Sequence, residues 1–395
     1  MKKPSFASRR KPLIITVTLV CIIFAIANYT TWRSKDALML SNINGIFLLV
    51  FSENDKKQEE FYKRIEKLQN QFMANQNERL AVLQKQNAQM LDTIQAMRIP
   101  PSHLNIRDKL IFMLPYDPTA KFPGYIWQTW KYGLNDDNFI KQYRDGEKLW
   151  AGKNPGFVHE VFNDETSYAF VKHLYAHVPE VILAYDALPD AILKIDFFKY
   201  LVLFARGGVY ADIDTMPLQP IPNWIPDNVS PTEIGLIISV GSESNSPQWN
   251  MESRHRRLEF GQFVIQAKPG HPILREIIAQ ITTKTSRKQR KLRDGDLLSF
   301  QDNSNDILLE LSRWTGSGAW TDVIFEILND YVKSSHYKPV TWKEFHDLAT
   351  PKLVSDVLVF PIKSFASDIE VSRDGKITDA IAFVKHYGDQ LWKES

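Results

Sequence analysis

The sequence predicts an α/β fold, an open sheet with helices on its faces, preceded by a transmembrane helix and a helical coiled-coil stalk. Three observations support this prediction. Residues 13–29 carry no charge and are largely apolar, residues 55–97 repeat apolar side chains at heptad spacing, and helix-like and strand-like segments alternate from residue 104 onward. The expected segments are a cytoplasmic tail (1–12), the span (13–29), a lumenal stem (30–103) with the coiled coil (55–97), and the folded domain (104–395).

Composition and charge fit a folded protein that has no nucleic-acid partner. Of the 395 residues, 44% are hydrophobic and 24% are charged, as is usual for a globular chain. The formal net charge of +2 lacks the basic excess that binding to a polyanion requires. The single cysteine, Cys21, lies in the apolar run, so the folded domain must be stabilised by packing and not by a disulfide.

The apolar run near the start has a basic flank on its N-terminal side. Residues 13–29 approach the lower length limit for a bilayer-spanning helix, roughly 17 residues. The positive-inside rule then places the rest of the chain in the lumen, as a single-pass type II protein. A cleaved signal peptide is the alternative, because Ala25–Ala27 is a permissible cleavage site. The short span favours the thinner membranes of the early secretory pathway.

The segment 55–97 is predicted to be a long helix that can pair in a coiled coil. It contains no Pro or Gly, and its apolar side chains recur at steps of three and four residues, with one slip. The seam consists of Phe61, Ile65, Leu68, Phe72, Leu80, Leu83, Met90, Ile94 and Met97. An amphipathic helix folded against the globular part is the alternative. Ile99–Pro101 ends the helix, because proline cannot continue it.

The folded domain begins with a predicted buried strand and, later, a helix that carries two charges. Phe122–Trp130 forms the strand and ends in polar residues, at the edge where ligands bind in open α/β sheets. Asp190 starts the helix, and Gly207-Gly208 stops it. Asp196 and Lys199 are three residues apart, so both project from one helix face.

The next segment, Val209–Asp214, alternates as a strand does. This pattern predicts that Asp212 and Asp214 share one face, roughly 7 Å apart. Unpaired carboxylates at that spacing repel each other, and a divalent cation removes the repulsion. Mg²⁺ or Mn²⁺ with oxygen ligands also suits a diphosphate. An isolated Asp-x-Asp is weak support for a metal site, but the preceding glycine turn and Asp/Lys helix strengthen it.

These motifs resemble family 32 of the glycosyltransferases, over roughly residues 104–395. The likeness is greatest to the fungal initiation-specific α-1,6-mannosyltransferases of the Golgi and their homologue in the mannan polymerase complex. The matching residues are Ile126–Trp130, Asp196–Tyr200, Gly207–Thr215, Thr315–Gly318, and His386 near Trp392. The resemblance implies a nucleotide-binding fold of the glycosyltransferase A type.

The resemblance also implies a reaction and a location. The donor would be GDP-mannose and the cofactor Mn²⁺ (or Mg²⁺). The product would be an α-1,6 mannosyl linkage on a mannose-containing N-glycan acceptor, made with retention of configuration and without a covalent intermediate. The expected location is the cis-Golgi membrane, with other mannosyltransferase subunits of a Golgi complex as partners. Two alternatives stay open, a structural subunit of such a complex and a lipid-directed mannosyltransferase that acts on inositol phosphoceramide.

By resemblance, Asp212, Asp214 and His386 would hold the metal, with Asp212 also touching the donor ribose. From spacing alone, His386 could equally be a histidine at a strand end. Thr315–Gly318 could be a plain turn, and the basic run Lys284–Arg293 is predicted to be a solvated loop.

By the same resemblance, Asp196 would bind sugar hydroxyls, Trp127, Gln128 and Thr129 would line the nucleotide pocket, and Lys199 would face the donor. The sequence departs from the family pattern twice. Many members carry Arg at the position of Lys199, and lysine keeps the charge but not the bidentate fork. Many also carry Pro at the position of Ser317.

Overall fold

The computed structural model describes residues 60–78, 81–82, 99–134, 136–249, 256–293, 304–330, 338–366 and 380–388. The chain divides into two compact units, Met1–Thr93 and Ile94–Ser395. The predicted span at 13–29 lies outside the described residues. Among the residues that are described, no helix is both long enough and apolar enough to cross a membrane.

In the first unit, residues 60–78 form a helix. Four of its apolar side chains are largely exposed: Phe61 by 40%, Ile65 by 42%, Leu68 by 56% and Phe72 by 62%. They recur on one side of the helix, where a partner helix would cover them. The rest of the predicted seam, from Leu80 onward, lies outside the described residues. Pairing in a coiled coil therefore stays a prediction.

The second unit is built on a mixed sheet of eight strands in the order β2-β1-β3-β7-β5-β9-β8, with β6 paired to β5. These strands are β1 Tyr125–Thr129, β2 Val158–Phe162, β3 Gly208–Ala211, β5 Leu236–Glu243, β6 Leu258–Phe260, β7 Val264–Ala267, β8 Lys352–Val354 and β9 Val357–Phe360. β1 is parallel to β2 and β3, whereas β7 is antiparallel to β3 and β5. A separate antiparallel pair joins β4 Thr215–Pro217 to β10 Val384–His386.

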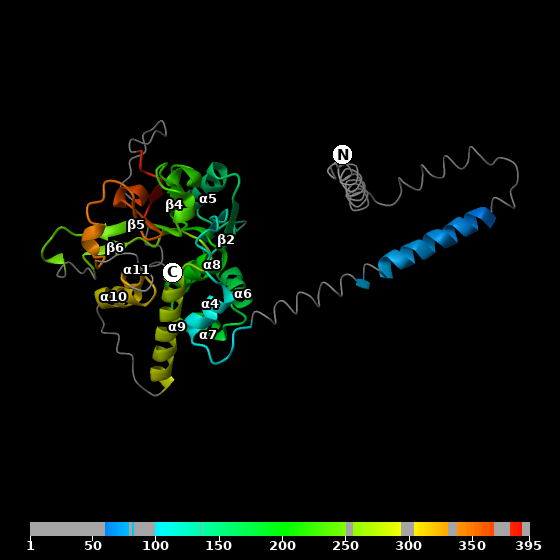
Figure 1. Ribbon diagram of the computed structural model, residues 1–395, viewed down its shortest axis with the longest axis horizontal. Coiled ribbons are helices and arrows are strands. Elements are labelled where there is room, and N and C mark those ends of the chain that lie inside the picture. Colours follow the sequence, from blue (N-terminus) through cyan, green and yellow to red (C-terminus); the bar gives the residue numbers. More distant parts are fainter. Residues whose placement is uncertain are drawn as a thin grey trace, which may run out of the picture. The chain divides into compact units, whose positions relative to one another are not determined.

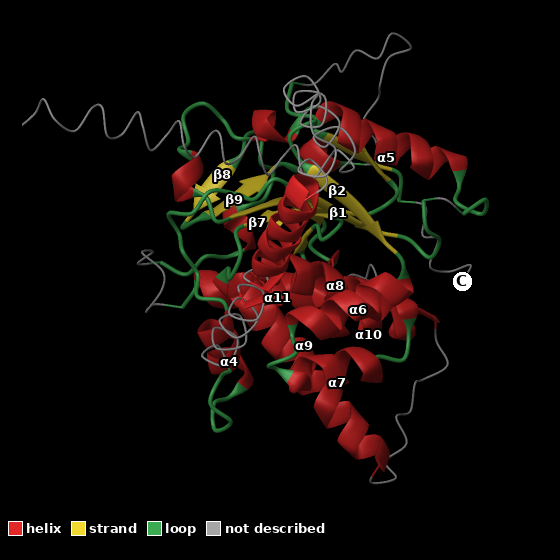
Figure 2. Cartoon of the chain, turned by 90° about the vertical axis from the view of Figure 1, so that its right-hand side faces the viewer, coloured by secondary structure: helices red, strands yellow, loops and turns green. Residues whose placement is uncertain are grey.

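Helices cover both faces of this sheet, and their order along the chain can be followed in Figure 1. They are α4 Ile106–Met113, α5 Lys141–Lys153, α6 Asp164–Leu174, α7 Pro179–Ala187, α8 Ala191–Arg206, α9 Pro272–Arg293, α10 Ser304–Trp314 and α11 Ser317–Leu328. Figure 2 shows α6, α7, α8 and α9 on one face and α5 on the opposite face. Short 3₁₀ turns at Ile221–Trp224, Pro231–Glu233, Trp342–Glu344 and Ile362–Phe365 complete the loops.

Alternate residues of each central strand enter two separate cores. In β1, Trp127 packs with the helices that include α8, whereas Ile126 packs with Trp150 of α5. In β3, Tyr210 belongs to the same core as Trp127, and Val209 belongs to the same core as Ile126. A sheet that is buried on both faces needs apolar residues at successive positions, as these strands have. The predicted α/β architecture is confirmed.

Helix α8 begins and ends where its sequence signals predict. The Asp190 side chain accepts a hydrogen bond from the backbone N–H of Ile192 at 3.0 Å and caps the first turn. At the other end, Gly207 and Gly208 have φ values of +65° and +94°, which disfavour any residue with a Cβ. A Cβ on Gly208 would lie 2.6 Å from the carbonyl oxygen of Tyr125. The two glycines therefore permit α8 to turn directly into β3 beside β1.

The strand that leads to the Asp-x-Asp motif ends earlier than the alternation predicted. β3 stops at Ala211, and Asp212–Asp214 form a turn into β4. Thr215 closes this turn, because its backbone N–H and its hydroxyl both donate to the carbonyl of Asp212, at 3.1 and 2.5 Å. The two carboxylates are thus brought together by a turn and not by one strand face.

The basic run Lys284–Arg293 was also assigned wrongly, because it forms the last turns of α9 and not a loop. Lys288 Nζ lies 2.5 Å from Glu310 Oε1 of α10, and Lys284 Nζ donates to the carbonyl of Arg313 at 3.1 Å. Long basic side chains extend from a helix as readily as from a loop, so composition alone did not reveal the helix.

The exposed seam of the first unit yields a prediction about association. The double substitution Leu68→Glu and Phe72→Glu should weaken self-association of the full chain, or its binding to a related transferase, because charges at a and d positions oppose a packed seam. Sedimentation in detergent and co-purification from membranes measure this.

The matched control is Lys63→Glu with Asn70→Glu, which adds two carboxylates on the opposite side of the same helix. Equal association of both double variants with the unaltered chain would contradict the coiled-coil interpretation.

Candidate active site

The carboxyl ends of β1 and β3 open into a cavity of about 470 Å³. Thr129 lines it from the last position of β1, and Asp212 lines it from the turn after β3. Asp196 and Lys199 enter from α8. This is the sheet edge at which ligands bind in open α/β folds.

One end of the cavity holds three potential metal ligands, Asp212, Asp214 and His386, whose ligand atoms all lie within 4.8 Å of one another. His386 Nε2 is 3.4 Å from Asp214 Oδ2. β10 carries the histidine to this place by pairing with β4, opposite Thr215. The Phe263 ring stacks on the imidazole with a centroid distance of 4.2 Å and fixes its plane. The two carboxylates supply the oxygen ligands that Mn²⁺ and Mg²⁺ prefer, and the imidazole would add a nitrogen ligand.

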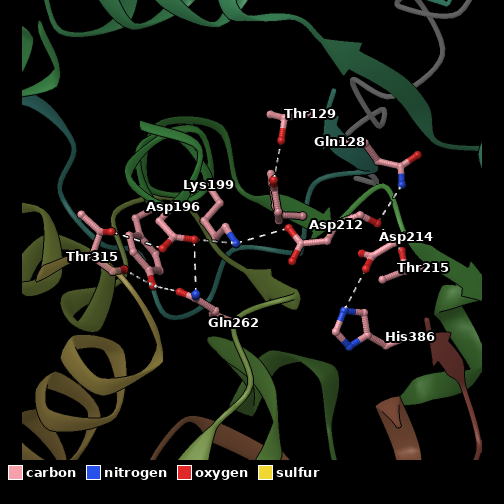
Figure 3. A network of polar contacts seen from close by, with 12 residues as sticks. Gln128, Thr129, Asp196, Lys199, Asp212, Asp214, Thr215, Gln262, Thr315 and His386 are labelled. Atoms are coloured by element: carbon pink, nitrogen blue, oxygen red, sulfur yellow. Dashed lines mark hydrogen bonds and ion pairs between the residues drawn. The ribbon is translucent and has the colours of Figure 1, made fainter. Parts of the chain in front are cut away.

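A chain of charges leads from this triad into the cavity (Figure 3). Lys199 Nζ lies 3.3 Å from Asp212 Oδ1 and 3.1 Å from Asp196 Oδ1, and its side chain is only 2% exposed. The opposite oxygen of Asp196 accepts a hydrogen bond from the Thr315 hydroxyl at 3.2 Å, and Gln262 Nε2 donates to Oδ1 at 3.2 Å. The predicted Asp196–Lys199 pair and the Asp-x-Asp turn therefore form one network.

Burial sets the protonation of this network. Burial alone would lower the pKa of Lys199, but the carboxylates of Asp212 and Asp196 outweigh it and raise that pKa well above the ordinary value. Lys199 is therefore a permanent cation. Burial raises the pKa of Asp212; Lys199 opposes this rise, and the neighbouring Asp214 adds to it. A bound cation would favour the ionised carboxylates in the same way as Lys199 does.

The three β1 residues predicted for the nucleotide pocket have different surroundings. Thr129 lines the cavity and shares a hydrogen bond of 2.7 Å with the Tyr210 hydroxyl. Gln128 is fully buried, and its Nε2 donates to the carbonyl of Asp212 at 3.2 Å. Trp127 is outside the cavity lining, and its Nε1 donates to the Gly207 carbonyl at 2.8 Å. Trp127 and Gln128 thus hold the ends of β3 in place.

Sequence reasoning missed His159, which supports the Asp-x-Asp turn through Gln128. His159 Nε2 lies 2.9 Å from Gln128 Oε1, and burial lowers the pKa of His159 to about 4, so the ring is neutral at neutral pH. Since the Gln128 amide donates to Asp212, its oxygen must accept, and His159 Nε2 carries the proton. Neither His159 nor Gln262 is part of a sequence motif, so no local pattern indicates its role.

The cavity thus places an Asp-x-Asp turn and a buried cation at the end of a parallel strand pair. Residues 141–231 match the family model described as a glycosyltransferase sugar-binding region containing a DXD motif. That segment carries α8, the glycine turn, Asp212 and Asp214.

Curated relatives extend this match over most of the chain. HOC1 of Saccharomyces cerevisiae, named as a glycosyltransferase, is 45% identical and aligns over 79% of this chain and 75% of its own length. The initiation-specific alpha-1,6-mannosyltransferases of Candida albicans and S. cerevisiae are 37% and 31% identical, over 74% and 73% of this chain and 78% and 82% of their own. The chain belongs to this glycosyltransferase family and is a glycosyltransferase.

The triad yields a prediction about Asp214. Asp214→Ala should reduce glycosyl transfer by more than about tenfold, a loss of over about 1.4 kcal/mol in transition-state stabilisation, because the carboxylate would serve the metal. Mn²⁺ affinity, measured by calorimetry, should fall in parallel, while the thermal unfolding midpoint changes little. Asp186→Asn, on the exposed side of α7, is the control. Transfer above a tenth of the unaltered rate would show that the site is misassigned.

Proposed function

We propose that this enzyme transfers mannose from GDP-mannose, in α-1,6 linkage, to a mannose-containing N-glycan acceptor during outer-chain (mannan) synthesis. The observation that supports it best is the buried Lys199 beside the triad of Asp212, Asp214 and His386. This arrangement gives one cavity a place for a divalent cation and a fixed positive charge, both of which a leaving diphosphate needs. The names of the relatives support mannose and the α-1,6 linkage.

In this mechanism, Asp212, Asp214 and His386 would hold Mn²⁺ (or Mg²⁺), which would supply Lewis-acid stabilisation of the diphosphate leaving group. Lys199 adds a cation that needs no reorganisation, because two carboxylates and the core already hold its side chain. Its position between Asp212 and Asp196 suits the junction of diphosphate and sugar.

Retention of configuration follows, in this proposal, from attack on the same face as the leaving group. Asp196 is the carboxylate at the sugar end of the charge network, and it is bound by Lys199, Gln262 and Thr315. Burial raises the pKa of Asp196, and these three contacts oppose that rise and occupy its oxygens, so it suits the binding of donor hydroxyls better than covalent attack. The transfer would then pass through an oxocarbenium-like state without a covalent sugar on the enzyme. The fold would be of the glycosyltransferase A type.

The location is part of the same proposal. A span at 13–29 would anchor the chain as a type II protein in the cis-Golgi membrane, with the cavity in the lumen, where N-glycans are extended. The exposed seam of residues 60–78 would assemble it with other mannosyltransferase subunits.

The direct test is an assay of the purified full chain with GDP-mannose, Mn²⁺ and α-mannose oligosaccharides of graded length. We expect added mannose to be released by an α-1,6-specific mannosidase, and chelation of the metal to abolish transfer reversibly. UDP-glucose is the control donor. Transfer from UDP-glucose alone, or a product that resists the mannosidase, would contradict the proposed substrate and linkage.

A second prediction separates an enzyme from a purely structural subunit. Lys199→Ala should cost about 2–4 kcal/mol in transition-state stabilisation, because it removes the fixed cation beside the leaving group. Lys199→Arg should keep or raise activity, since it retains the charge and gains a bidentate fork. Mannan chain length in cells and kcat/KM in vitro measure this. Normal mannan with both Lys199→Ala and Asp214→Ala would decide for the structural role.

A further inference from the structure

A further carboxylate, Glu259 of β6, lines the cavity apart from the charge network described above. The hydroxyl of Ser317 donates a hydrogen bond to Glu259 Oε2 at 2.8 Å. Ser317 is the first residue of α11, so Glu259 lies beside the N-terminus of that helix. Neither residue has a place in the donor mechanism.

The segment 259–263 places Glu259 relative to that mechanism. Phe263 stacks on His386 of the metal triad, and its carbonyl accepts from the backbone N–H of Asp212 at 2.8 Å. Gln262, one residue earlier, bonds to Asp196 at the sugar end. Glu259 lies three residues further, about 10 Å along an extended chain. The segment 259–263 therefore runs from the metal triad, past Asp196, to Glu259.

The residues that bond to this segment from Thr315 and α11 follow the same order. Figure 3 shows Asp214 and His386 at one end of the network and Thr315 at the other, with Lys199 between. Thr315 bonds to Asp196, and Ser317, two residues later, bonds to Glu259. Both segments thus continue beyond Asp196, away from the triad. If the diphosphate and its cation lie at the triad, as proposed above, this side of the cavity is left for the acceptor.

The chemistry at this end suits a sugar acceptor. A carboxylate accepts strong, charge-assisted hydrogen bonds from sugar hydroxyls. Gly241 and Gly261 also line the cavity, and they pack so tightly that a Cβ on Gly241 would lie 2.8 Å from the Gly261 backbone. Ser242 adds a hydroxyl-bearing residue to the lining. The lining near Glu259 thus combines polar groups with two residues that have no side chain.

We propose that Glu259, oriented by Ser317, is the acceptor-binding carboxylate and that it accepts hydrogen bonds from hydroxyls of the incoming α-mannoside. This inference rests on the proposed function and names the acceptor end of its site. It also gives Ser317 a role. A residue without a hydroxyl at this position could not orient Glu259 in this way.

The test separates the acceptor half of the reaction from the donor half. With the full chain, GDP-mannose and Mn²⁺, Glu259→Gln should raise the KM for α-1,6-linked mannotriose by about tenfold or more, the loss expected for hydrogen bonds to a charged group. The KM for GDP-mannose and its slow hydrolysis without acceptor should stay within about twofold, because the donor contacts are intact. A merely structural role would change both halves together.

Matched variants sharpen this result. Ser317→Ala and Ser317→Pro should each raise the acceptor KM, and Ser317→Thr should restore it, since threonine keeps the hydroxyl. Proline is tolerated at the first position of a helix, so Ser317→Pro should fold. Glu243→Gln is the control, because Glu243 is half-buried on the neighbouring strand β5 but is not part of the cavity lining.

Calorimetric binding of the same mannotriose, with GDP and Mn²⁺ present, gives a readout that does not depend on turnover. Loss of binding in Glu259→Gln alone would support the proposal. Unchanged binding and KM, or a parallel fall in donor hydrolysis, would overturn it. Failure of the unaltered chain to use GDP-mannose would contradict the proposed function instead, and the binding comparison would still decide the role of Glu259.

Discussion

The ion pairs of Lys199 are the interaction on which the rest of the site depends. A lysine that is 2% exposed is costly to bury as a cation, and it is stable here because Asp196 and Asp212 lie 3.1 and 3.3 Å from it. Removal of one partner of such a pair typically costs about 3–5 kcal/mol, since the other charge stays buried. Lys199 therefore ties the helix α8 to the turn that carries the Asp-x-Asp motif.

The supports of that turn come from three directions. Thr215 closes it through the carbonyl of Asp212, Gln128 of β1 bonds to the same carbonyl, and the backbone N–H of Asp212 bonds to Phe263. His159 in turn holds Gln128 from β2. These three contacts use backbone or buried polar groups, so they do not occupy the carboxylate oxygens, which face Lys199 and His386. In a preorganised site, the contacts that fix the geometry are different from the groups that take part in the reaction.

The local parts of this arrangement could be predicted because short-range geometry decides them. Asp190 caps α8, and Gly207-Gly208 adopt positive φ values, as their residue types indicate. Two predictions were wrong because each residue pattern is compatible with two different local structures. An alternating Val209–Asp214 fits a strand, but the hydroxyl of Thr215 closes a turn after Ala211. A basic run fits a loop, but Lys284–Arg293 continues α9.

Local sequence pattern was enough to predict the α/β class, the i,i+3 spacing of Asp196 and Lys199, and the proximity of Asp212 to Asp214, since helix pitch and chain connectivity set these. Only the tertiary structure brought His386 to Asp214, Gln262 to Asp196 and Glu259 to Ser317. Those contacts depend on β10 pairing with β4, on β6 pairing with β5, and on α11 reaching β6. Strand register and helix packing join segments far apart in the chain, and no local pattern encodes which of them will meet.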